Sequence, residues 1–128
     1  MNLYSKIFLV AGCLFLASAG ALSAYGFHGL AGKVGAGELE AWQWAVQMQY
    51  YHGLGLVLTG ALGARLGGWA WLGAGALMIA GIVVFSCLIY AQTLGAPEAI
   101  GEIVPLGGSA FMLSWLLLAI AVIQAARR

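Results

Sequence analysis

The chain has 128 residues, of which 63% are hydrophobic and 7% are charged, and its net charge is +1. An ordinary soluble domain is about one quarter charged, so this composition excludes a soluble globular protein. The near-zero net charge also removes the electrostatic basis for nucleic-acid binding. We predict a single transmembrane domain over residues 1–128, with the lipid bilayer as its first partner.

The first apolar run, from Tyr4 to Tyr25, is similar to a signal peptide, because Lys6 precedes a hydrophobic stretch. However, apolar sequence continues for about 12 residues past Cys13, which is too long for a signal core. We therefore expect an uncleaved transmembrane helix over about residues 4–26. A flexible, glycine-rich loop is predicted to follow it over residues 26–37.

Three further helices are predicted, over about residues 38–66, 69–93 and 105–127. Glu38 and Glu40 fit the first turn of a helix, where carboxylates meet unpaired N–H groups. Pro105 fits the start of the last helix, where no N–H partner is needed. An apolar run of about 20 residues crosses the ~30 Å hydrocarbon core. The predicted fold is an all-α integral membrane protein, a bundle of four transmembrane helices.

The charged residues predict the orientation of this bundle. With four crossings, one side of the membrane holds the termini and the second loop, with Lys6, Arg65, Arg127 and Arg128. The other side has Lys33 as its only base, so the positive-inside rule places both termini in the cytoplasm. The predicted location is the cell inner (plasma) membrane, with several passes. Aromatic residues expected at the two interfaces are Trp69 and Trp71 inside, and Tyr25, Trp42, Trp44, Tyr50 and Tyr90 outside.

Polar side chains at membrane depth are the best functional candidates, because the bilayer makes them costly. Gln49 and His52 are spaced i, i+3 and are predicted on one helix face, and Ser86 and Tyr90 are spaced i, i+4. With Ser109, they fall in the outer half of the predicted bundle. Two interpretations stay open: a polar cavity open to the outside with His52 at its floor, or interhelical hydrogen bonds that fix the packing.

The sequence predicts no metal site, no cofactor and no enzymatic activity. His28 is expected about 14 Å above His52, whereas two axial ligands of one haem need similar depths. Cys13 and Cys87 are expected to differ in depth by roughly 15 Å, which is too far for a disulfide or a shared metal. The chain lacks Asp, and its glutamates fall in predicted loops or at a helix start, so no catalytic constellation emerges.

Four segments together resemble the small bacterial inner-membrane family of YgdD and YwdK type, to which transmembrane protein 256 is the animal relative. They are Ser-Ala-Tyr-Gly-Phe-His-Gly-Leu at 23–30, Trp-Ala-Val-Gln-Met-Gln-Tyr-Tyr-His at 44–52, Gly-Ile-Val-Val-Phe-Ser-Cys-Leu-Ile-Tyr at 81–90, and Val-Pro-Leu-Gly-Gly-Ser-Ala-Phe at 104–111. Val104 and Cys87 replace a usual Thr and a usual Gly. The resemblance implies a four-helix membrane protein of undefined biochemical role. It gives weight to His28 and the polar residues above, and to a structural turn at Pro105, Gly107 and Gly108.

Our leading hypothesis is a structural or accessory membrane protein that assembles into a homo-oligomer or a larger membrane complex. Small-residue pairs such as Gly53 and Gly60 favour close helix contacts, which can lie within one chain or between chains. The alternative is an oligomeric pore or a binding site for a small solute or lipid, formed by the outward-facing polar cluster around His52.

Overall fold

The computed structural model describes residues 1–127, and these form helices and short connections with no β-strand. The first helical segment is α1 with the π-helical turn η1, and the second is α2. The third comprises α3, the π-helical turn η2 and α4, and a 3₁₀ turn, η3, leads into α5. The bounds are α1 Leu3–Tyr25, η1 Gly26–Leu30, α2 Ala36–Ala61, α3 Gly68–Gly81, η2 Ile82–Cys87, α4 Leu88–Thr93, η3 Glu98–Glu102 and α5 Val104–Ala126.

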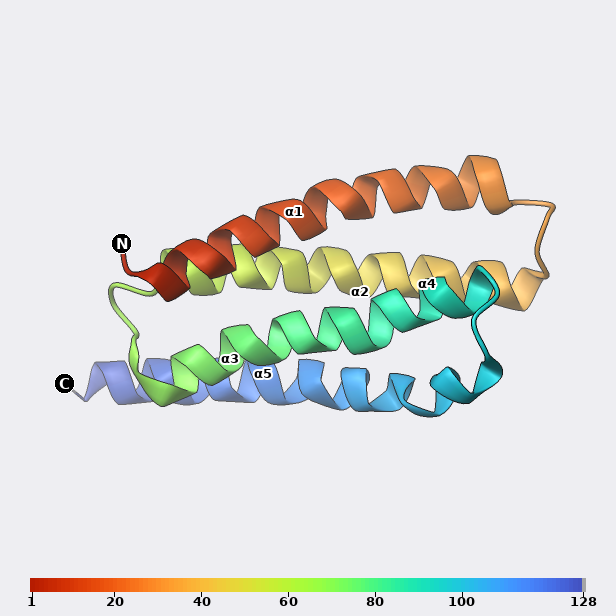
Figure 1. Ribbon diagram of the computed structural model, residues 1–128. Coiled ribbons are helices and arrows are strands. Elements are labelled where there is room, and N and C mark those ends of the chain that lie inside the picture. The colour runs from red at the N-terminus through yellow and green to blue at the C-terminus, as the bar shows by residue number, and fades with distance from the viewer. Residues whose placement is uncertain (128) are drawn as a thin grey trace.

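The long helical segments lie side by side, with α1 packed along α2 and α3 packed along α5 (Figure 1). The N- and C-terminal ends lie at one end of the molecule, as does the connection between α2 and α3 (Figure 1). That end carries Lys6, Arg65 and Arg127, whereas the opposite end carries the glutamates of residues 38–40 and 98–102. The separation of charge along the chain is therefore also a separation in space.

Local sequence sets where several helices begin. The Oδ1 atom of Asn2 accepts a hydrogen bond from the Ser5 amide at 2.8 Å and so caps α1. Gly67 and Gly68 have φ angles of 58° and 77°, which only glycine adopts without strain, and they permit the tight turn into α3. Pro105 lies in the first turn of α5, where its missing N–H costs nothing.

The prediction of a flexible loop from residue 26 is wrong for residues 26–30, which continue the first helix as η1. The Ala31 amide bonds the Gly26 carbonyl at 3.1 Å, an i→i+5 bond that widens the helix by one residue. Gly26 lies against the indole of Trp42, and a Cβ there would fall 2.8 Å from Cδ1. The contact with α2 thus holds this turn in helical form.

Three aromatic residues predicted at the membrane interfaces, Trp42, Trp71 and Tyr90, are instead buried in the protein. Trp42 is 1% exposed and Trp71 is 3% exposed. Each indole N–H bonds a backbone carbonyl of another segment: Trp42 the carbonyl of Leu22 at 2.9 Å, and Trp71 that of Thr59 at 2.7 Å. A buried partner satisfies the indole as well as interfacial water does, so these tryptophans hold helices together.

Glycines let α1 and α2 approach each other closely. A Cβ on Gly12 would lie 2.8 Å from the Gly53 carbonyl oxygen, and one on Gly60 would lie 2.9 Å from the Ser5 carbonyl oxygen. The predicted small-residue pair Gly53 and Gly60 therefore serves a contact within the chain. This is the backbone-to-backbone packing that membrane helices use in place of apolar burial.

Three continuous helical segments are long and apolar enough to cross a membrane: Leu3–Leu30, Gly68–Thr93 and Glu98–Ala126. The remaining helix, α2, has 26 residues and is of similar length, but it carries Gln43, Gln47, Gln49 and His52. A multi-pass membrane protein is thus confirmed.

Candidate functional site

Gln49 of α2 is the centre of a hydrogen-bonded network that joins three helices. Its amide nitrogen donates to the Phe15 carbonyl at 2.8 Å and to Ser18 Oγ at 2.9 Å, both on α1. Its Oε1 atom accepts from the Tyr90 hydroxyl of α4 at 2.7 Å. Gln49 is 2% exposed. Both amide hydrogens and the carbonyl are thus used, and the residue links α1, α2 and α4.

Two more contacts reinforce this network, both on the side of Gln49 that faces the start of α2. One turn toward the start of α2, the Ser86 hydroxyl of η2 donates to the Ala45 carbonyl at 2.7 Å. The Trp42 ring packs between Tyr25 and Tyr90, with ring centroids 5.7 and 4.6 Å away. These contacts all originate from one face of α2, because Trp42, Ala45 and Gln49 follow helical spacing.

His52 of α2 makes a second, separate contact, with side chains of α5. Its Nε2 atom lies 3.0 Å from the indole nitrogen of Trp115, and its Nδ1 atom lies 2.7 Å from the Met48 carbonyl oxygen. An indole N–H only donates, so Nε2 must accept, and Nδ1 must carry the proton that bonds the carbonyl. The ring also stacks on Phe111 at 3.6 Å. These partners fix His52 as a neutral imidazole with both nitrogens occupied.

The structure does not bring Gln49 and His52 into one cluster, although the sequence predicted a shared face. Residues spaced i, i+3 differ by about 60° around a helix axis. Because α2 packs against α1 and α4 on one side and α5 on another, that angle directs the two side chains to different neighbours. Gln49 and Tyr90 are joined directly, Ser86 lies on the same side, and His52 does not contact them.

The other predicted site residues lie outside both contacts. His28 is exposed in η1, away from His52. Ser109 is exposed and bonds the Pro105 carbonyl of its own helix at 3.2 Å. Sequence analysis missed Trp115, whose indole is the only side-chain hydrogen-bond partner of His52 within residues 1–127. The spacing could have indicated this contact, because Phe111 and Trp115 are four residues apart and share one face of α5.

The predicted turn at the start of α5 contains one glycine that packs and one that does not. A Cβ on Gly107 would lie 2.5 Å from the Phe85 amide nitrogen, so this glycine lets α5 approach the backbone of η2. Gly108 has no atom within 4 Å of such a Cβ. It borders an open hollow of about 460 Å³, lined also by His52, Phe85 and Ser109.

Within residues 1–127, no buried side-chain nitrogen or oxygen lacks a hydrogen-bond partner. The same residues contain no group of three or more His, Cys, Asp or Glu side chains able to hold a metal ion. Cys13 and Cys87 are free thiols exposed on the surface of the helices. The arrangement as described fixes helices in place and presents no activated nucleophile.

Comparison with known proteins gives a consistent match along the chain. A family model described as a protein of unknown function, DUF423, matches residues 22–108. The UPF0382 membrane protein YwdK of Bacillus subtilis is 38% identical over 120 residues, covering 93% of this chain and 98% of the relative. A UPF0382 membrane protein of Staphylococcus aureus is 36% identical over 122 residues, covering 93% and 97%. No solved structure matches the chain.

Proposed function

From the premise that this chain belongs to the DUF423 family of proteins of unknown function, we propose that it is a four-span membrane protein with a structural or accessory role. The observation that carries this proposal is the complete pairing of its buried polar side chains. Gln49, Ser86 and His52 each hold a neighbouring helix. Hydrogen bonds between helices are one of the means by which membrane proteins fix their packing.

Two observations support α2 as the fourth span. At 1.5 Å per residue, its 26 residues extend about 39 Å, which exceeds the ~30 Å hydrocarbon core. Its polar residues Gln49 and His52 point into the protein, so the lipid-facing cost of a polar helix is largely avoided. Gln43 and Gln47 remain exposed, close to the outer end.

The proposed orientation places both termini in the cytoplasm. Within residues 1–127, Lys6, Arg65 and Arg127 lie at the end that holds the termini, and Lys33 is the one Lys or Arg at the other end. In membrane proteins, the side whose short connections carry the excess of Lys and Arg faces the cytoplasm. The described acids, Glu38, Glu40, Glu98 and Glu102, then lie on the outer side.

The accessory role is tested by the oligomeric state in native membranes. Bifunctional crosslinking of the full chain in its own membranes is expected to capture a second copy or a partner. Light scattering of the detergent-extracted protein then gives the mass of the assembly. A monomer in detergent with no crosslinked neighbour in the membrane would refute the role.

The alternative of a solute site or pore centred on His52 is less well supported. Both ring nitrogens are engaged, and the hollow beside the ring is lined chiefly by apolar side chains such as Phe85 and Phe111. We expect that proteoliposomes with His52→Ala show the same solute flux as wild type. A flux abolished by this substitution, with the fold intact, would restore the pore hypothesis.

A further inference from the structure

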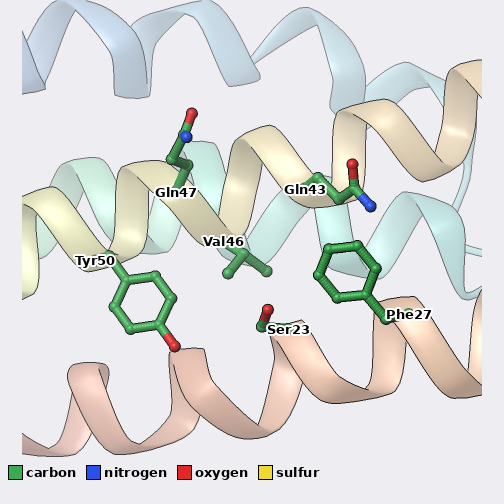
Figure 2. Close-up of a pocket in the computed structure, with 6 residues that line it drawn as sticks. All are labelled: Ser23, Phe27, Gln43, Val46, Gln47 and Tyr50. Carbon is green, nitrogen blue, oxygen red and sulfur yellow. The ribbon is translucent and has the colours of Figure 1, made fainter.

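A groove of about 290 Å³ lies between the first helical segment and α2, near the outer end of the molecule (Figure 2). It is separate from the contacts of Gln49 and His52. Its walls combine hydroxyl, amide and aromatic groups over an apolar floor. The lining residues are Ser23, Phe27, Gln43, Val46, Gln47 and Tyr50.

The hydroxyl groups of this groove are free. Within residues 1–127, neither Ser23 nor Tyr50 makes a side-chain hydrogen bond. Ser18 and Ser114, in contrast, bond the backbone of their own helices at 2.8 and 2.6 Å. Figure 2 shows Ser23 on α1 and Tyr50 on α2 bordering the same space, with Val46 between them. Both hydroxyls are thus available to a ligand as donors and as acceptors.

Counted along α2, the groove lies in the outer part of the hydrocarbon core, toward the headgroups. Val46 is 15 residues from Ala61, the last residue of α2, which corresponds to roughly 22 Å along the helix from the inner end of a ~30 Å core. An amphiphile that reaches this depth presents its hydroxyl and ester groups here, with its chains below. The amides of Gln43 and Gln47 add further uncharged partners at the mouth and make no hydrogen bonds within the described residues.

Charge limits the ligands that fit this groove. None of the lining residues is charged, and Glu40 borders an adjoining hollow together with Gln43 and Gln47. A neighbouring carboxylate repels an anionic headgroup, and no base is present in the lining to pair with one. A volume of about 290 Å³ is at the lower limit of ligand sites, so it suits a headgroup and not a whole lipid.

We propose that this groove binds the uncharged, hydroxyl- or ester-bearing head of a membrane lipid, with the acyl chains running along the outside of α1 and α2. The proposal does not depend on the accessory role, because it rests on different residues. It assigns a selective site to one face of the protein.

The test is native mass spectrometry of the full chain titrated with dioleoylglycerol, using dioleoylphosphatidylglycerol as the anionic comparison. We expect one saturable dioleoylglycerol adduct and at least tenfold weaker binding of the anionic lipid. Ser23→Phe fills the groove and is expected to abolish the adduct. Ala24→Phe is the matched control, because Ala24 is the adjacent residue and is exposed. Equal binding of both lipids, or an adduct unaffected by Ser23→Phe, would overturn the proposal.

A second pair of variants keeps the test independent of folding. Tyr50→Phe removes one hydroxyl and keeps the ring, and loss of one hydrogen bond is expected to weaken the adduct about fivefold. Tyr51→Phe is the control, since Tyr51 is 50% exposed and does not line the groove. Thermal melting in detergent checks that each variant is folded. If Tyr50→Phe and Tyr51→Phe bind alike, the groove is not the site.

Discussion

Replacing Gln49 with leucine removes the three hydrogen bonds that join α1, α2 and α4 at similar side-chain volume. Interhelical bonds in membrane proteins average about 0.6 kcal/mol each, which gives about 2 kcal/mol for the three. The buried Tyr90 hydroxyl then loses its acceptor, and an unpaired buried donor costs about 1 kcal/mol or more. We expect Gln49→Leu to lower the free energy of unfolding by about 3 kcal/mol.

The assay is reversible unfolding by sodium dodecyl sulfate in mixed micelles, followed by helical circular dichroism. Gln47→Leu is the matched control: it lies on the same helix and is exposed, with no hydrogen bond in the part of the chain that the structure describes. Its expected change is below about 0.5 kcal/mol, as for other surface substitutions. If the two variants differ from wild type by the same amount, the assigned role of Gln49 is wrong.

A double-mutant cycle with Tyr90→Phe isolates the bond between the two side chains. The 2.7 Å distance and the burial of both residues predict a coupling energy of about 0.6–2 kcal/mol. Strict additivity of Gln49→Leu and Tyr90→Phe would show that the pair contributes nothing beyond separate packing.

Four further predictions concern the start of α5, the His52 contact and the orientation of the chain. Gly107→Ala is expected to destabilise the protein by about 1–3 kcal/mol, because its Cβ collides with the Phe85 backbone, whereas Gly108→Ala has open space and changes the melting temperature little. Trp115→Phe leaves His52 Nε2 without its donor and is expected to cost about 1 kcal/mol. In the wild type, ¹⁵N NMR should show protonated Nδ1, and a protonated Nε2 would contradict the assignment. Reporter fusions that are active only in the cytoplasm should be active at both termini, and activity at one terminus alone would refute the even number of spans.

The sequence was sufficient to predict the helical segments and the membrane environment. Apolar runs of helical length separated by charges leave few alternatives, because an unpaired backbone cannot be exposed to lipid. The start of α5 at Pro105 could likewise be predicted from its chemistry. These features depend on local sequence alone, so they can be predicted without knowing which helices contact each other.

The inward-facing tryptophans could not be predicted from composition, since an indole suits both an interface and a buried carbonyl. The helical spacing around Trp42 does, however, indicate which face of α2 it occupies. Trp42 precedes Ala45 and Gln49 at helical spacing, so all three share a face. The partner carbonyl of Leu22, in contrast, belongs to another helix, and its position depends on packing that no local pattern specifies.

The distribution of polar groups on α2 has a physical reason. Lipid chains are as apolar as leucine, so burial of apolar area does not bring membrane helices together. Close packing and hydrogen bonds must supply the specificity instead. α2 contributes both, through Gly53 against α1 and through Gln49 and His52 toward α1, α4 and α5. Its lower hydrophobicity follows from these contacts, because an all-apolar α2 would make no such hydrogen bonds and would not define which helices it contacts.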